Sequence, residues 1–342
     1  MGRPFRIRDI AVQAGLSETT VDRVLNGRAG VSVRARRQVE QAIVDLERQQ
    51  SQIRLGGRTF VIDLVMQAPA RFSSAVRAAL EAELPGLRPA MIRARFDLTE
   101  TATALELVSA LDRIRRRGSH GVVLKAPDVP SIVAAVDRLV AAGIPVVTLV
   151  TDLPTSRRSA YVGIDNRAAG TTAAYLISQW LGPRPGNVLV TLSRESFRGE
   201  EEREMGFRTA MRRFAPSRRL VELPETEGLD ETMHALALSA LNADPALVAV
   251  YSIGGANQAI VNAFTTLGRD CAVFIAHDLD ADNTRLLASG HLSAVLHHDL
   301  PTDLRRTCQA ILQSHSALPG APHSLPSAIQ IVTPHNVPTH LP

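Results

Sequence analysis

The chain has 342 residues, enough for two or three domains, and 45% of them are hydrophobic, which excludes a disordered chain. It contains no run of eighteen apolar residues, and its first ten residues, MGRPFRIRDI, lack the apolar core of a signal peptide. We therefore expect neither membrane insertion nor export, and a cytoplasmic location. Cys271 and Cys308 match no disulfide framework and no metal spacing, so we expect two buried free thiols.

The charge is unevenly distributed along the chain. Residues 1–58 hold eleven arginines against six acidic residues, a net charge of +5, whereas the rest of the chain holds 27 basic and 28 acidic residues. Lys125 is the only lysine, so the richness in arginine is a property of the whole composition and its placement is the informative part. A basic amino-terminal module on a near-neutral body is the electrostatic pattern of phosphate binding.

The amino-terminal segment predicts three helices. Apolar residues recur at helical spacing over 7–14, and Gly15 then ends the first helix. Ser17 is the expected N-cap of a second helix over 18–25, and a third helix is expected over 33–47. Two short helices joined by a tight turn, with a third closing the core, form a helix-turn-helix unit.

In such a unit the second helix enters the major groove of DNA and its outward side chains reach base edges. We expect Arg23 to be the principal base-reading side chain, because arginine forms the commonest bidentate contact to guanine. Arg34, with Arg36 and Arg37, is a candidate for phosphate contacts, although these arginines could also form a solvated helix face. The predicted DNA-binding residues are Ser17, Glu18, Thr19, Thr20, Arg23, Asn26 and Arg34.

One stretch carries a specific resemblance. The pattern I-x-D-I-A-x-x-A-G-L-S-x-x-T-V-x-R-V-L-N-G from Ile7 to Gly27, with Val31-Ser32 following, resembles the headpiece of the lactose-repressor (LacI/GalR) family. The resemblance implies a homodimer on double-stranded operator DNA. It also implies a hinge helix that wedges a leucine into the minor groove. Residues 48–58 lack the family's G-Y-x-P-N and A-R-x-L, so they are expected to form a linker in which Ile53 or Leu55 is the candidate wedge.

After the linker, short apolar runs alternate with helical patterns. This alternation predicts an α/β fold of doubly wound parallel sheets covered by helices on both faces. Strands are expected at 60–66, 121–126, 145–150, 186–192, 247–253 and 271–277. Helices are expected at 73–84, 101–117, 130–142, 168–181, 200–213, 230–242, 256–267 and 281–289. A break near 163–168 divides these elements into two similar halves, the layout of the periplasmic-binding-protein type I core that the family carries as its effector domain.

The expected domain division follows from this layout. Residues 1–47 form the headpiece, 48–58 the linker and 59–342 the effector domain. Within the effector domain, the amino-terminal lobe is expected at about 59–164 plus 293–318. The carboxy-terminal lobe is expected at about 165–292 plus 319–342.

The resemblance places candidate ligand contacts at the ends of strands, where doubly wound sheets bind ligands. Carboxylates, an arginine fork, an amide and an aromatic ring together suit a sugar or polyol. The candidates are Arg71, Phe72, Asp152, Asp165, Asn166, Arg203, Asn257, Asp278 and His298. Two of them have another explanation: Asp278 could cap the helix expected at 281, and Asp165 could be a turn residue.

We expect neither a metal nor a cofactor. His297 and His298 are adjacent, so on a strand they point to opposite faces. The sequence contains no G-x-x-x-x-G-K-[ST], no G-x-S-x-G and no H-E-x-x-H, and its GGANQA lacks the spacing of a dinucleotide fingerprint. The favoured function is a ligand-controlled transcriptional regulator, most simply a repressor. The alternatives are a solute-binding protein, which the headpiece disfavours, and an α/β enzyme, for which no catalytic constellation is found.

Overall fold

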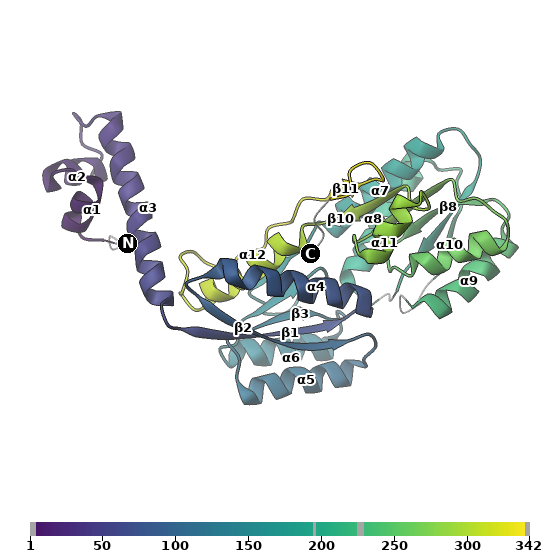
Figure 1. Cartoon of the computed structure of the whole chain (residues 1–342), viewed down its shortest axis with the longest axis horizontal. Helices are drawn as coiled ribbons and strands as arrows, with labels where there is room; N and C mark the ends of the chain where they lie inside the picture. The colour runs from purple at the N-terminus through teal and green to yellow at the C-terminus, as the bar shows by residue number, and fades with distance from the viewer. Residues whose placement is uncertain (1–4, 194–195, 224–228, 339–342) are drawn as a thin grey trace.

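The computed structural model describes residues 5–193, 196–223 and 229–338, apart from the side chains of Arg48 and residues 51–55. The chain forms a helical headpiece that stands away from two α/β lobes, and a long helix leads from the headpiece to the first strand (Figure 1). Within the described part of the chain, no helix has the length and apolar character needed to cross a bilayer.

The headpiece contains α1 (Ile7–Ala14), α2 (Glu18–Leu25) and α3 (Val33–Leu55). Gly15 ends α1 in the left-handed conformation with φ at 64°, and the Ser17 side chain accepts from the backbone N–H of Thr20, as predicted for an N-cap. The three helices bury one small shared core, made of Ile10, Ala11, Val21, Val39 and Ala42. The predicted helix-turn-helix unit is therefore confirmed.

The prediction that the third helix ends at residue 47 is wrong, because α3 continues to Leu55 through most of the expected linker. The added segment, RQQSQIRL, is rich in arginine and glutamine, which lose little rotamer freedom in a helix, and it contains neither proline nor glycine. The glycines at 56 and 57 follow directly. The candidate wedge residues Ile53 and Leu55 lie outside the described side chains.

The first lobe has a five-stranded parallel sheet in the order β2-β1-β3-β4-β5. Its strands are β1 (Thr59–Gln67), β2 (Met91–Thr99), β3 (Gly121–Lys125), β4 (Val146–Leu149) and β5 (Ala160–Val162). Its helices are α4 (Ala70–Glu83), the 3-10 turn η1 (Leu84–Leu87), α5 (Ala104–Arg117), α6 (Pro130–Ala141) and α12 (Leu300–Ser314). Successive residues of β1 point to opposite faces, so Leu64 packs under α4 and α12 while Val65 packs under α5 and α6 (Figure 1).

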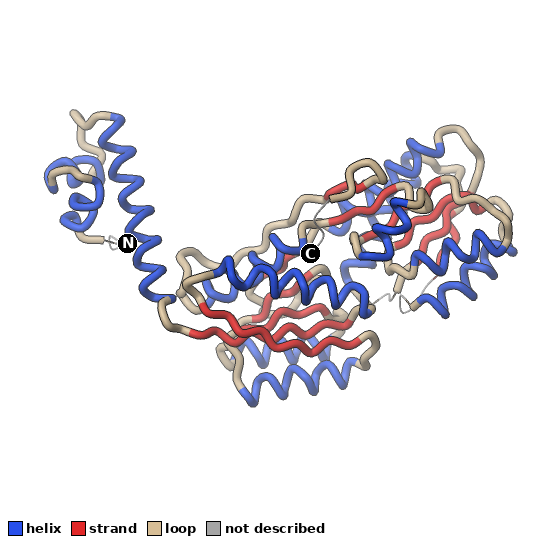
Figure 2. Tube along the Cα trace, in the orientation of Figure 1, coloured by secondary structure: helices blue, strands red, loops and turns tan. Residues whose placement is uncertain are grey.

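The second lobe has a six-stranded sheet in the order β11-β10-β9-β8-β6-β7. Its strands are β6 (Asn187–Thr191), β7 (Leu220–Leu223), β8 (Leu247–Ser252), β9 (Val273–His277), β10 (Ala294–His297) and β11 (Gln330–Val332), of which only β11 is antiparallel to its neighbour. Its helices are α7 (Asn166–Leu181), α8 (Arg198–Phe214), α9 (Asp230–Ala243), α10 (Asn257–Thr266) and α11 (Ala281–Ala288). Helices lie on both faces of each sheet, as Figure 2 shows, which confirms the predicted fold class.

The sequence pattern identified six strands but not β2, β5, β7, β10 and β11. Of the missed strands, β10 lies inside the second sheet and has only four residues. The other four missed strands, β2, β5, β7 and β11, lie at the edges of the sheets, where one strand face meets solvent and the apolar run is interrupted by charged residues or shortened to three or four residues. The expected lobe division also needs correction, because β10 pairs with β9 in the second sheet although 293–318 was assigned to the first lobe.

The chain crosses between the lobes three times. The first crossover leads from β5 to α7, the second from β10 to α12, and the third from α12 back to β11. The first and third are joined by a bridge between Ile164 and Ser327, in which the Ser327 N–H donates to the Gly163 carbonyl at 2.8 Å. The carboxyl ends of both sheets face the space beside these crossovers.

Candidate ligand-binding site and DNA-binding headpiece

A pocket lies between the lobes and contains about 790 Å³ of empty space, part of it open to solvent. Six strands contribute residues at or just beyond their carboxyl ends, which is where doubly wound sheets bind ligands. These residues are Gln67, Lys125, Val150, Thr151, Ser193, Ile253, His277 and Asp278. Three helices also contribute to the wall: α4 supplies Arg71 and Phe72, α8 supplies Gly199, Glu200 and Arg203, and α11 supplies Asn283.

Several buried polar atoms on this wall have no hydrogen-bond partner among the described residues. They are both side-chain polar atoms of Gln67, Nη2 of Arg203, Nδ1 of His277 and Oδ1 of Asp278. Buried polar groups in folded proteins are almost always hydrogen-bonded, since an unmade bond costs about 1–3 kcal/mol. Donors and acceptors from both lobes that converge on one pocket are therefore suited to a polar ligand.

Lys125 places a buried ammonium group on the wall. Its Nζ donates to the Gln67 carbonyl at 3.0 Å and lies 4.0 Å from the ring centroid of Phe197, which belongs to the other lobe. Lys125 forms no ion pair with any described residue. Burial lowers the pKa of Lys125 to about 8, although the carboxylates of Glu200 and Asp278 act to raise it.

The position of Arg203 depends on close packing between α7 and α8. A Cβ atom at Gly170 would overlap the carbonyl oxygen of Arg203, and one at Gly206 would overlap the carbonyl oxygen of Arg167. Glycine at these two positions lets the two helix backbones touch. Arg203 is 3% exposed, and its Nε donates to Asn166 Oδ1 at 2.8 Å.

Asp278 follows β9 in the left-handed backbone conformation, with φ at 62°. This conformation is uncommon for a residue other than glycine and often marks a functional site. Burial raises the pKa of Asp278, but the nearby His298 and the positive charge of Arg203 outweigh burial and hold it well below its usual range. The group is therefore a carboxylate in the pocket wall.

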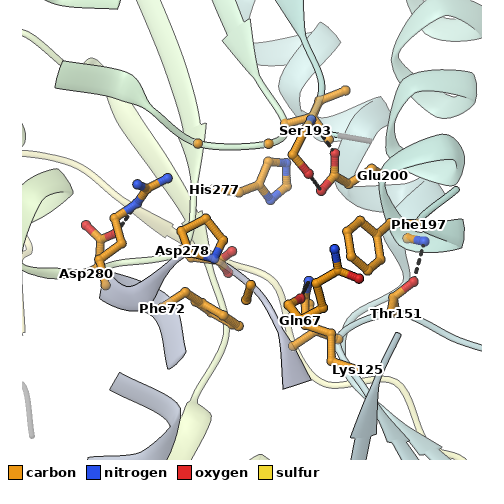
Figure 3. Close-up of a pocket in the computed structure, with 18 of the residues that line it drawn as sticks. Gln67, Phe72, Lys125, Thr151, Ser193, Phe197, Glu200, His277, Asp278 and Asp280 are labelled. Carbon is orange, nitrogen blue, oxygen red and sulfur yellow. Dashed lines mark hydrogen bonds and ion pairs between the residues drawn. The ribbon is translucent and has the colours of Figure 1, made fainter. Parts of the chain in front are cut away.

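The remaining polar wall groups are paired, and two rings supply apolar surface. Arg71 Nε lies 3.3 Å from Asp280 Oδ2, and Glu200 accepts from both the N–H (2.8 Å) and the hydroxyl (2.5 Å) of Ser193. Figure 3 shows the rings of Phe72 and Phe197 on different sides of the pocket, with the polar groups around them. Polar groups around apolar ring surfaces suit a small polyhydroxylated molecule.

The structure brings four of the nine predicted ligand contacts into the pocket wall: Arg71, Phe72, Arg203 and Asp278. Asp280, not Asp278, caps α11, accepting from the N–H of Asn283. Sequence analysis missed Gln67, Lys125, Ser193, Phe197, Glu200, His277 and Asp280. Gln67 and Lys125 end predicted strands, so their place at the strand ends was the available signal.

The other five predicted contacts lie behind the wall or away from it. Asp152 is paired with Arg158, and Asp165 is the exposed N-cap of α7. Asn166 supports Arg203, Asn257 donates to Asn283 Oδ1 at 2.7 Å, and His298 lies between Asp278 and Asp303. Short polar side chains after a strand serve caps and turns as readily as ligands, which is why the sequence pattern did not separate them.

The headpiece presents a polar face on α2. Glu18, Thr19 and Arg23 are exposed, and Thr20 is partly buried. Ser17 is occupied as the N-cap of α2, and Asn26 donates to Asp22 Oδ1 at 2.7 Å. The guanidinium of Arg23 donates a hydrogen bond to the Ala29 carbonyl at 3.0 Å. On α3, Arg34, Arg36 and Arg37 are all exposed.

Comparison with known sequences agrees with both parts of this description. The family model described as bacterial regulatory proteins, lacI family, matches residues 6–47, and that of the periplasmic binding protein domain matches residues 69–312. The chain is 29% identical over 286 residues to the HTH-type transcriptional regulator MalR of Streptomyces coelicolor, a match that covers 81% of this chain and 73% of that protein.

Solved structures share the fold of the two lobes. A solute-binding protein of Burkholderia graminis in complex with D-arabinose has a TM-score of 0.76 at 17% identity, covering 84% of this chain and 99% of that one. The glucose-galactose binding protein GanP of Geobacillus stearothermophilus has a TM-score of 0.72 at 18% identity, covering 82% and 99%. A carbohydrate transporter of Acidothermus cellulolyticus in complex with myo-inositol has a TM-score of 0.70 at 16% identity, covering 82% and 96%. With a lacI-type headpiece joined to a periplasmic binding protein domain, the chain belongs to the LacI/GalR family of bacterial transcriptional regulators.

Proposed function

We propose that this regulator is a homodimeric cytoplasmic repressor whose affinity for operator DNA is set by a monosaccharide or polyol bound between the two lobes. The observation that carries the ligand part is the set of buried, unpaired polar atoms of Gln67, Arg203 and His277 in the wall of one pocket, which the Asp278 carboxylate also lines. Two of the similar solved structures are complexes with D-arabinose and with myo-inositol, compounds whose hydroxyl groups both donate and accept.

In this proposal the ligand bridges the lobes. Asp278 and His277 of the second lobe and Gln67 and Lys125 of the first accept or donate hydrogen bonds to its hydroxyl groups, and the Phe72 and Phe197 rings cover its apolar surface. Because both lobes bind the same molecule, the ligand favours one relative orientation of the lobes over the other. Binding a ligand and binding DNA require no chemical reaction, so the proposed function is not enzymatic.

The headpiece supplies the DNA contacts. Glu18, Thr19 and Arg23 on α2 are proposed to reach base edges, with Ser17, Thr20 and Asn26 bordering them, while Arg34 contacts phosphate. We propose a headpiece at 1–47, a connecting segment at 48–58 that is largely helical, and an effector domain from 59 onward. In a homodimer two headpieces meet two half-sites, so the operator is expected to be a near-palindrome.

Three measurements test the proposal. Selection of binding sites from random duplex DNA with the full chain should yield a near-palindromic operator. Deletion of residues 1–58 should abolish operator binding and leave ligand binding intact. A thermal-shift screen of D-arabinose, D-glucose, D-galactose and myo-inositol, followed by sugar phosphates, should raise the melting temperature with at least one compound. Selection that yields no preferred sequence, or a deletion variant that still binds the operator, would contradict the regulator proposal.

A solute-binding protein is the second candidate, favoured by the fold shared with solute-binding proteins. It predicts ligand binding without sequence-specific DNA binding. The same deletion experiment therefore separates the two functions.

A further inference from the structure

A buried polar chain runs from the pocket wall into the three crossovers. His298, in the second crossover, is 1% exposed, and its Nδ1 lies 2.5 Å from Asp303 Oδ2 on α12. Asp303 is itself fully buried and also accepts from the hydroxyl of Ser327 in the third crossover. The Ser327 N–H donates to Gly163 in the first crossover. One series of hydrogen bonds therefore connects all three crossover segments that join the lobes.

The other end of this chain is the ligand-facing carboxylate. His298 Nε2 lies 3.6 Å from Asp278 Oδ1, which is longer than a hydrogen bond but within the range of an ion pair. Both atoms are buried and lack a hydrogen-bond partner among the described residues. They therefore face each other across a short gap at the rear of the pocket wall, with His298 outside the pocket and Asp278 lining it.

We propose that His298 is a positioning residue of the ligand site, which holds the Asp278 carboxylate toward the ligand and ties it through Asp303 to the crossovers. The inference rests on the proposed function, because it concerns the same pocket. A shift of Asp278 on binding a ligand hydroxyl then changes the contacts of His298 with Asp303, and those of Asp303 with Ser327. These are the contacts that must rearrange when the lobes reorient. His298 acts through Asp278 and does not itself touch the ligand.

The charges around His298 support a cation at this position. Burial lowers its pKa, but Asp278 and Asp303 outweigh burial and raise it to about 9. The neighbouring titratable and charged groups are Asp278 and His277 on the β9 side, His297 on β10, and Asp303 with Arg306 on α12. His297 differs: burial lowers its pKa to about 4, and its Nδ1 accepts from the Leu279 N–H at 3.1 Å.

His297 is consequently a matched control, since it is a buried histidine one residue away with no carboxylate within ion-pair distance among the described residues. Calorimetric titration with the compound that gives the largest thermal shift should show about tenfold weaker binding for His298→Gln, the loss of one charged contact. His297→Gln should stay within about threefold of the wild type. Asp303→Asn should also weaken binding, and the His298→Gln/Asp303→Asn double variant should be no weaker than His298→Gln alone, because both act through one chain.

A second measurement requires no ligand. In protein with ¹⁵N-labelled histidine, the His298 ring, assigned by its absence in His298→Gln, should show both nitrogens protonated at pH 7, whereas His297 should be neutral. In Asp303→Asn the His298 ring should lose its proton at lower pH. If His298→Gln fails to fold, Asp303→Asn carries the affinity test, and the histidine ring that changes in the Asp303→Asn spectrum identifies His298 in the wild type.

The proposal is overturned if His298 is neutral at pH 7, if both histidine variants lose affinity equally, or if the penalties of His298→Gln and Asp303→Asn multiply. Failure of the proposed function looks different. In that case no sugar or polyol shifts the wild-type melting temperature, while the protonation of His298 can still be measured.

Discussion

The ammonium group of Lys125 in the first lobe lies 4.0 Å from the ring centroid of Phe197 in the second, so the chain's only lysine makes its cation–π contact across the pocket. A desolvated ammonium without an ion-pair partner among the described residues destabilises the ligand-free protein, and the fold tolerates this cost at the site where a ligand is proposed to bind.

Lys125→Met is therefore expected to stabilise the ligand-free protein while weakening ligand binding. Because the folded-state pKa of Lys125 is lowered to about 8, the wild type gains stability as pH rises from about 8 toward 10.5. Over that range the unfolded chain holds the proton and the folded one releases it. His298 contributes the same fall in stability to both proteins over this range, so Lys125 is isolated by comparing them. Denaturant unfolding at pH 7 and pH 9 should show that the change in unfolding free energy on raising pH is more favourable in the wild type than in Lys125→Met. A variant less stable than the wild type at pH 7 would contradict the prediction.

Between pH 6.5 and 8 the stability should fall with rising pH because of His298. Its pKa is raised from 6.5 to about 9, so its contribution is complete below pH 6.5 and is lost as pH rises toward 9. The lowered pKa values of His277 and His297 act only below pH 6.5. The free energy of unfolding should drop by up to about 1.4 kcal/mol per pH unit from this group. In denaturant unfolding, this decrease of the unfolding free energy between pH 6.5 and 8 should vanish in His298→Gln and persist in His297→Gln.

Arg203→Ala should abolish the response to ligand and spare operator binding. The change removes a buried guanidinium whose Nη2 has no partner among the described residues, so a ligand hydroxyl loses its donor at a cost of about 1–3 kcal/mol. Arg208→Ala, on the same helix but paired with Glu204 and Glu222 away from the pocket, is the matched control. Arg203→Ala that responds at the wild-type ligand concentration would remove Arg203 from the site.

Arg23→Ala should cost about 1–3 kcal/mol against the selected operator and relax one base position. Arg34→Ala should instead weaken binding to all sequences and lower the salt dependence by about one counterion per contact. Binding measured on the operator, on single-base variants and over a salt series distinguishes the two roles. Equal loss on every sequence for Arg23→Ala would make it a phosphate contact.

The sequence predicted the first two headpiece helices residue by residue, because their caps and their apolar spacing are local signals. Ser17 and Gly15 behave as their residue types suggest. Six of the seven interior strands were also predictable, since strands buried on both faces are continuous apolar runs; the exception is the four-residue β10. Edge strands such as Met91–Thr99 were not, because half of their surface is polar.

The ligand site was predictable only in part. Arg203 and Asp278 follow the family pattern and line the pocket. Asp152 and His298 have equally suitable side chains, but neither lines the pocket. Asp152 is paired with Arg158 away from the pocket, and His298 is bound to Asp303 behind the pocket wall. Which of two similar residues faces a cavity depends on tertiary contacts that a single sequence does not display. The β10 strand shows the same limit, because only its pairing with Ala276 and neighbouring residues places it in the second lobe.

The central claim is that a ligand between the lobes controls the affinity of the headpiece for DNA. Fluorescence anisotropy of the labelled operator, titrated with the full chain with and without saturating ligand, tests it directly. Ligand should change the dissociation constant by about 5- to 150-fold, the usual range of allosteric coupling. This change should disappear in Arg203→Ala. An operator affinity that is the same with and without a ligand shown by calorimetry to be bound would contradict it.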